Sequence, residues 1–207
     1  MTLKTDEFIK VLARAPQPSP VSLGLVAFAL VIAGWGLTYI ILGLRPDLAA
    51  LPDSFLRKTG ALALAAVIAS LGLQRAARPL ALPFPTSAAM IAALAFVVWL
   101  AREWTTVPTH DIMASFLLPN FRFCLGFTTI YGLAAMAGLV YALRAYAPAD
   151  GRKAATCIGL AASFIAGLGY SLHCPIDSPT FILVAYGLPV TMLTLLARGV
   201  LPRFLQW

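Results

Sequence analysis

Two cysteines, Cys124 and Cys174, are the residues of this chain best suited to chemistry. Two thiols can be oxidised to a disulfide in a compartment such as the bacterial periplasm, or they can bind a soft metal ion as thiolates. Cys174 lies in the polar, proline-punctuated stretch 171–179, where we expect its thiol to be accessible and modifiable. The further side chains that could assist the pair are His110, His173 and Asp177. The smallest candidate metal set is Cys124, Cys174 and His173, and the sequence leaves open whether the pair meets a metal, an oxidant or only each other.

Each of these residues also has an ordinary structural interpretation. Taken singly, Cys124 is a small buried hydrophobe and His173 an interfacial histidine bonded to backbone. The sequence Asp177-Ser-Pro179 favours a cap and first turn of a helix, because Asp or Ser before Pro suits that position. Arg45-Pro-Asp47 is typical of an interfacial stop whose Arg and Asp could pair or bind an outer group. Cys157 is predicted to lie a membrane thickness away from the other two cysteines, as a buried hydrophobe.

The elements that must position the thiols are membrane helices. Hydrophobic residues make up 60% of the 207 residues, charged residues 11%, and the mean hydropathy is +0.87. A water-soluble globule needs more polar surface than this. Runs near the roughly 20 residues that span hydrocarbon occur at residues 21–44, 59–73, 84–101, 123–143, 154–172 and 181–201. Because lipid-exposed backbone must bond within its own segment, we predict an all-α bundle of six transmembrane helices.

Lysine and arginine residues give this bundle an orientation. The tails and the second and fourth connections together carry ten of the 15 cations, whereas the first, third and fifth connections carry five. The positive-inside rule therefore places both termini in the cytoplasm. Cys124 and Cys174 then share the outer face. The net charge of +7 is spread thinly over membrane loops, which argues against a nucleic-acid partner.

Residues 1–20 form a segment distinct from the transmembrane part, 21–207. Phe8, Ile9 and Leu12 recur at helical spacing, Thr5 can cap the helix and Pro16 stops it, so we predict a short amphipathic helix. Such a helix either lies in the headgroup layer or on the inner loops, or serves as a peptide that a cytosolic partner binds in a groove. Periodicity alone does not choose between them.

Catalysis finds little support in the sequence. It contains no hydrolase elbow, phosphate loop or metalloprotease motif, and no obligatory cofactor is expected. The main alternative class is a small membrane transporter or channel, with the glycine-rich spans and Pro189 as pathway features, although Pro189 is equally an ordinary kink. A membrane oxidoreductase is a third interpretation, which the lack of a CxxC motif disfavours. The sequence also leaves open whether two copies pair as a homo-oligomer.

Several motifs occur in an order that resembles the NrsF family of bacterial membrane anti-sigma factors. They are the tail 3–13, the turn 44–49, and the stretch His173-Cys-Pro-Ile-Asp-Ser-Pro-Thr-Phe181 followed by Tyr186-Gly187. The resemblance runs essentially from end to end. The family often has two acids after Cys-Pro, whereas this chain has Ile176 and then Asp177, which leaves one carboxylate for a metal site.

The resemblance implies a protein of the bacterial inner membrane that holds an extracytoplasmic-function sigma factor at its cytoplasmic face. It implies release when the outer sensor cysteines, Cys124 and Cys174, meet metal or oxidant, with no cofactor beyond a transient heavy or transition metal ion. The amino-terminal motif of the family matches Lys4, Thr5 and Asp6, which favours sigma-factor binding through this motif together with Phe8, Ile9 and Leu12. We expect modification of the thiols to tie the fourth helix to the loop between the fifth and sixth.

Overall fold

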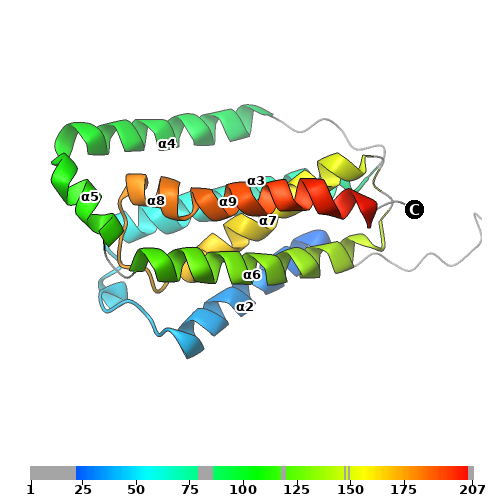
Figure 1. The fold of residues 1–207 in the computed structure, drawn as a ribbon, viewed down its shortest axis with the longest axis horizontal. Coiled ribbons are helices and arrows are strands. Elements are labelled where there is room, and N and C mark those ends of the chain that lie inside the picture. Colours follow the sequence, from blue (N-terminus) through cyan, green and yellow to red (C-terminus); the bar gives the residue numbers. More distant parts are fainter. Residues whose placement is uncertain (1–21, 79–85, 118–119, 147, 149, 205–207) are drawn as a thin grey trace, which may run out of the picture.

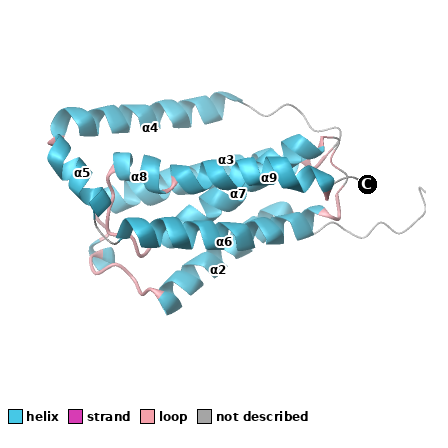
Figure 2. Cartoon of the chain, viewed as in Figure 1, coloured by secondary structure: helices cyan, strands magenta, loops and turns pink. Residues whose placement is uncertain are grey.

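The computed structural model describes residues 22–78, 86–117, 120–146, 148 and 150–204. These residues form helices and connections without a strand (Figure 2). The helices are α2 (Leu23–Ile41), α3 (Asp53–Ala76), α4 (Thr86–Thr106), α5 (Thr109–Leu117), α6 (Asn120–Leu143), α7 (Gly151–Tyr170), α8 (Pro179–Ala185) and α9 (Gly187–Val200), with 3-10 turns η1 (Leu48–Ala50) and η2 (Leu201–Arg203). Within the described residues, six helical segments are long and apolar enough to cross a membrane. The prediction of an all-α, six-span protein is confirmed to that extent.

Helix α7 is the centre of the bundle. It contacts α2, α3, α6 and α9, and 72% of the residues in its most apolar stretch are buried inside the protein. Lipid tails are as apolar as leucine, so membrane helices associate chiefly through close packing of small residues. Gly159 shows this directly, since a Cβ atom there would lie 2.6 Å from the Cα of Thr194 on α9. The small residues of α7 thus permit the surrounding helices to approach closely.

The sixth crossing is divided into two helices. Helix α8 ends at Ala185 and α9 begins at Gly187, with Tyr186 between them. Pro189 has no N–H to donate to the carbonyl of Ala185, and its ring crowds that turn. The kink predicted at Pro189 is therefore a short break one turn before it. Together, α8, α9 and η2 form one apolar segment from Pro179 to Arg203.

The connections alternate between the two ends of the bundle. The connection 42–52, helix α5 and the connection 171–178 gather at one end, named here the thiol end (Figure 1). The start of α2 and the ends of α3, α6 and η2 lie towards the opposite end (Figure 1). Helix α4 lies to one side, where it contacts α3 and α8 (Figure 1). Both ends of the described chain thus lie at the end away from the thiols.

Candidate functional site

Cys124 and Cys174 come together in one apolar cluster at the thiol end. Cys124 lies near the start of α6 and Cys174 in the connection between α7 and α8. Both side chains have no solvent exposure and are free thiols. They interact directly with each other, beside the buried hydroxyl of Tyr186. The expectation that the two cysteines share one end of the bundle is confirmed.

The expected accessibility of Cys174 is wrong. Its polar neighbours predicted an exposed loop, but the loop turns inward at the end of α7, where the N–H of Cys174 donates to the carbonyl of Tyr170 (3.3 Å). The thiol then packs among Tyr170, Phe181 and Tyr186. Polar groups of the loop are satisfied by Lys58 of α3 and Arg45 of the connection 42–52, so the loop can be buried. A reagent must therefore be small, or the loop must open, to reach the sulfur.

Lys58 is the main side chain that holds this loop, and sequence reasoning missed it. Its Nζ atom lies 2.6 Å from the carbonyl oxygen of Cys174, 3.1 Å from that of Ile176 and 2.6 Å from Oδ1 of Asp177. The sequence placed Lys58 in the first outer connection, but α3 begins at Asp53, which carries Lys58 inside the bundle with no exposure. A cation at the margin of an apolar run is the signal that could have found it, since such residues are costly in a membrane and are retained with a named partner.

Arg45 and Asp177 complete a buried charge network next to Lys58. Arg45 binds Asp47 (Nε to Oδ1, 2.6 Å) and Asp177 (Nη1 to Oδ1, 2.8 Å), and Ser54 donates to Asp177 (2.8 Å). The predicted pairing of Arg45 with Asp47 is thus confirmed. Burial alone would raise the pKa of the Asp177 carboxyl, but hydrogen bonds from Arg45 and Lys58 outweigh burial and hold that pKa below its usual value. Asp177 is an ionised anchor of the loop.

This setting also changes the acidity of one thiol. The pKa of Cys174 lies below that of an ordinary thiol, because the Cys124 side chain hydrogen-bonds to it and the nearby ammonium of Lys58 favours negative charge, although burial opposes both. Thiolates are the reactive form of cysteine towards oxidants and metals. The surroundings of Cys174 therefore favour its thiolate form.

The start of α8 lies beside the cysteine loop and is bound from two directions. Ser178 is the N-cap residue and accepts from the N–H of Phe181 (3.1 Å), with Pro179 in the first turn, so the cap predicted for the sixth helix is confirmed. From α4, Glu103 accepts from the N–H of Thr180 (2.9 Å), and the Nε1 of Trp104 donates to the hydroxyl of Thr180 (2.9 Å). Glu103 is buried, so these bonds attach α4 to the site.

The two histidines lie in different surroundings. His110 is 81% exposed on α5, where its Nε2 lies 3.2 Å from Asp111. His173 Nδ1 lies 3.1 Å from the carbonyl oxygen of Gly43, which is the backbone partner expected of an interfacial histidine. Across the described ranges, no three His, Cys, Asp or Glu side chains are grouped closely enough to hold a metal ion. Metal binding by Cys124, Cys174 and His173 stays a prediction, with Asp177 already bound to two cations.

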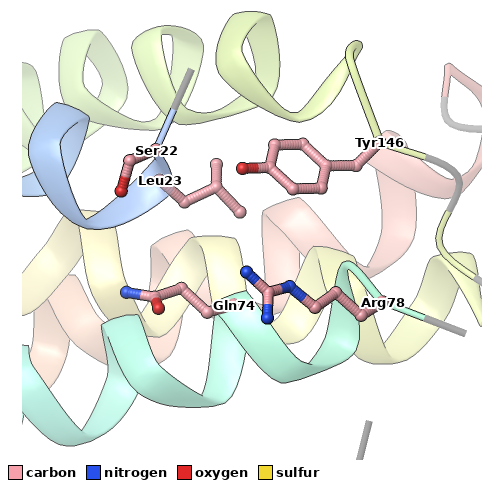
Figure 3. Close-up of a pocket in the computed structure, with 5 residues that line it drawn as sticks. All are labelled: Ser22, Leu23, Gln74, Arg78 and Tyr146. Atoms are coloured by element: carbon pink, nitrogen blue, oxygen red, sulfur yellow. The ribbon is translucent and has the colours of Figure 1, made fainter. Parts of the chain in front are cut away.

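A small cavity lies at the opposite end of the bundle. It has a volume of about 130 Å³ and is lined by Ser22, Leu23, Gln74, Arg78 and Tyr146. Figure 3 shows Gln74 and Arg78 facing Leu23 and Tyr146 across the cavity. Ser22 is the residue through which the amino-terminal tail enters α2. The predicted amphipathic helix and its sigma-binding residues Lys4, Thr5, Asp6, Phe8, Ile9 and Leu12 lie outside the described residues.

Cys157 is half-buried on α7, and its sulfur lies 3.6 Å from where a Cβ of Gly72 would stand, away from the other thiols.

The fold and site define a polytopic membrane protein. A buried thiol pair lies at one end of its helical bundle, and both ends of the described chain lie at the other. Residues 11–207 match the family described as a negative regulator of sigma F. The Anti-sigma-F factor NrsF of Caulobacter vibrioides (strain NA1000 / CB15N) is 30% identical over 224 aligned positions, which cover 99% of this chain and 100% of that protein. The chain belongs to the NrsF family, as its motifs indicated. No solved structure matches it significantly.

Proposed function

We propose that this protein is an anti-sigma factor that holds an extracytoplasmic-function sigma factor at the bacterial inner membrane and releases it when Cys124 and Cys174 are modified. The observation that carries the proposal is the contact of two free thiols at one end of the bundle, with both ends of the described chain at the other. Family membership supplies the sigma factor as partner, since the related Caulobacter protein is named an anti-sigma-F factor. In this proposal the thiol end faces the periplasm and both tails face the cytoplasm.

Helix α6 is the element that can carry a change from the thiols to the tails. Cys124 lies near one end of α6 and Leu143 at the other, about 28 Å apart at 1.5 Å per residue. Beyond Leu143, Tyr146 lines the cavity that Ser22 also lines. A packed helix moves as a rigid element, so a displacement at Cys124 also displaces the far end. The tail that we propose to bind the sigma factor precedes Ser22 in the sequence.

Either kind of modification would change the separation between Cys124 on α6 and the cysteine loop. Oxidation to a disulfide removes two electrons and two protons from the pair and brings the sulfur atoms to about 2.05 Å. A soft metal ion replaces the two thiol protons and bridges the sulfurs without electron transfer. The loop itself is held by Lys58 and Arg45, so in this proposal the change is passed on by α6. A coupling of about 1–3 kcal/mol is typical of allosteric proteins and would shift sigma-factor binding usefully.

The sensing half is tested by replacing both Cys124 and Cys174 with serine and measuring sigma-dependent transcription under metal and oxidant stress. We expect the response to disappear, whereas a matched Cys157→Ser variant should respond as the wild type does. An intact response in the double variant would refute sensing by this pair. Trials with cadmium ion and with hydrogen peroxide, run separately, distinguish metal from oxidant.

The binding half is tested at the amino-terminal tail. The double change Ile9→Asp and Leu12→Asp places charge on the predicted apolar stripe and should abolish co-purification with the sigma factor. Lys10→Gln is the matched control, because Lys10 is not one of the apolar residues of this stripe, and it should leave co-purification intact. A transporter or channel would not need this stripe, so sigma-factor binding that survives the double change refutes the tail assignment.

A further inference from the structure

The cavity at the end of the bundle away from the thiols offers hydrogen-bond donors that no protein group uses. Gln74 and Arg78, four positions apart at the end of α3, line it together (Figure 3). Within the described residues, neither the Gln74 amide nor the Arg78 guanidinium makes a hydrogen bond or an ion pair. A guanidinium carries five N–H donors and an amide carries two. These donors are therefore available to a ligand that supplies several acceptor atoms.

The rest of the cavity wall comes from two other elements. Ser22 is exposed in front of the first turn of α2, and its hydroxyl does not cap that helix. Leu23 is buried and gives the cavity an apolar side. Tyr146 lines the cavity from the connection that follows α6. A ligand in this cavity would therefore contact α2, α3 and the connection after α6 at once.

The size and the depth of the cavity suit one phosphate group of a lipid. The cavity has a volume of about 130 Å³, and a water molecule occupies about 30 Å³ in the liquid, so a phosphorus atom with four oxygen atoms can enter. Helix α2 has 19 residues, which makes it about 28 Å long at 1.5 Å per residue. A bilayer has roughly 30 Å of hydrocarbon. Ser22 therefore lies near the level at which the hydrocarbon meets the headgroups.

The charges at this end of the bundle favour an anion. The start of α7 and the ends of α3, α6 and α9 lie there (Figure 1). Seven cations of the described residues belong to these parts, namely Arg75, Arg78, Arg144, Arg152, Lys153, Arg198 and Arg203, and one carboxylate, Asp150. The thiol end instead holds equal numbers, with Arg45, Arg57, Lys58, Arg102 and Arg122 against Asp47, Asp53, Glu103, Asp111 and Asp177. Basic pockets between membrane helices bind the headgroups of anionic lipids.

We propose that this cavity binds the phosphate group of an anionic phospholipid, with the Arg78 guanidinium on two phosphate oxygens and the Gln74 amide as a further donor. The planar fork of a guanidinium matches two oxygens of one phosphate. Leu25 and Phe28, each 63% exposed in the first two turns of α2, offer apolar surface to the acyl chains, which a free phosphate ion lacks. The bound headgroup joins α2, α3 and the connection after α6.

Three substitutions separate binding in the cavity from general attraction to a basic surface. Arg78→Gln removes the guanidinium, and Gln74→Leu removes the amide but leaves every charge in place. Arg198→Gln is the matched control, because it removes the same charge from an exposed position of α9 at the same end of the bundle. The circular dichroism spectrum of each variant shows whether it is folded.

The experiment counts the lipids bound to the full chain by native mass spectrometry. The chain is delipidated in a neutral detergent and titrated with phosphatidylglycerol, whose headgroup carries one negative charge. Phosphatidylcholine with the same acyl chains is the second probe, because a choline cation balances its phosphate. Inorganic phosphate, added to the complex with phosphatidylglycerol, is the third probe and distinguishes a lipid site from a site for the free ion.

We expect one phosphatidylglycerol to bind more tightly than phosphatidylcholine and to resist displacement by inorganic phosphate. Arg78→Gln should weaken this binding by about tenfold or more, because charge-assisted hydrogen bonds are lost. Gln74→Leu should weaken it by about threefold or more, since a neutral donor contributes less. Arg198→Gln should weaken it by less than about twofold, because salt and solvent screen an exposed charge that does not touch the ligand.

Four results would overturn the proposal. Unchanged binding in folded Arg78→Gln and Gln74→Leu, or equal losses in Arg78→Gln and Arg198→Gln, would show that the cavity is not the site. Equal affinity for the two lipids would contradict an anionic headgroup. Displacement of the lipid by inorganic phosphate would assign the cavity to the free ion. The assay contains no sigma factor and requires no thiol chemistry, so its result is independent of the proposed function.

Discussion

Gly159→Ala gives a direct test of how closely the central helix is packed. A Cβ at residue 159 would lie 2.6 Å from the Cα of Thr194 and 3.1 Å from both the Cβ of Ala197 and the carbonyl oxygen of Leu193. Carbon atoms in good contact lie about 3.5–4.0 Å apart, so α7 and α9 must separate locally by about 1 Å. Two of the opposing atoms are backbone atoms, which cannot turn aside as a flexible side chain could.

The expected cost follows from overpacking. Inserting a methyl group into a packed interior typically costs about 1–3 kcal/mol. Replacing glycine with alanine in a helix stabilises the helix by up to about 1 kcal/mol. We expect the free energy of unfolding to fall by about 1–2 kcal/mol on balance. The measurement is unfolding of the chain in mixed micelles by increasing sodium dodecyl sulfate, followed by circular dichroism.

Gly126→Ala on α6 is the matched control, because a Cβ there meets nothing within 4 Å. The control should be neutral or stabilising by up to about 1 kcal/mol, since only the helix propensity changes. If Gly159→Ala were as stable as Gly126→Ala, the close approach of α7 and α9 would be refuted, and with it the central position of α7 in the bundle.

Two further predictions concern the thiol end. Glu103→Ala leaves the buried N–H of Thr180 unsatisfied and should lower the free energy of unfolding by about 1–3 kcal/mol. Arg102→Ala is the control at an exposed position and should change the free energy of unfolding little. Equal effects of the two substitutions would refute the attachment of α4 to the site. The pKa of Asp177 is lowered in the folded protein, so its contribution is present above the unfolded pKa of about 3.9 and is lost as pH falls through the folded pKa. Acid should therefore destabilise the wild type more than Asp177→Asn below about pH 4. Parallel plots of the free energy of unfolding against pH for the two proteins would contradict this.

The helical architecture could be predicted because hydropathy is a strong signal for membrane segments. The six predicted runs correspond to the six apolar helical segments, and the predicted cap at residues 177–179 is formed by Ser178. The boundaries were less accurate where a polar residue extends a helix. The run predicted from residue 59 belongs to a helix that begins at Asp53, because Lys58 finds its partners inside the protein.

The interior of the site could be predicted only in part. The alternation of connections places Cys124 and Cys174 at the same end, which the sequence was sufficient to indicate. Burial of the Cys174 loop depends on Lys58 and Arg45, which lie more than a hundred residues earlier in the chain, and no local pattern records that contact. The contact of Glu103 could likewise not be predicted, because its partner Thr180 belongs to a distant helix.

The central claim is that modification of Cys124 and Cys174 is coupled through the bundle to the affinity for the sigma factor. The most direct measurement is the dissociation constant of the sigma factor for the full chain in nanodiscs, with Cys124 and Cys174 reduced and then joined as a disulfide that mass mapping shows to be complete. A coupling of about 1–3 kcal/mol predicts binding about 5- to 150-fold weaker in the disulfide form. Equal affinity in the two forms would contradict the account.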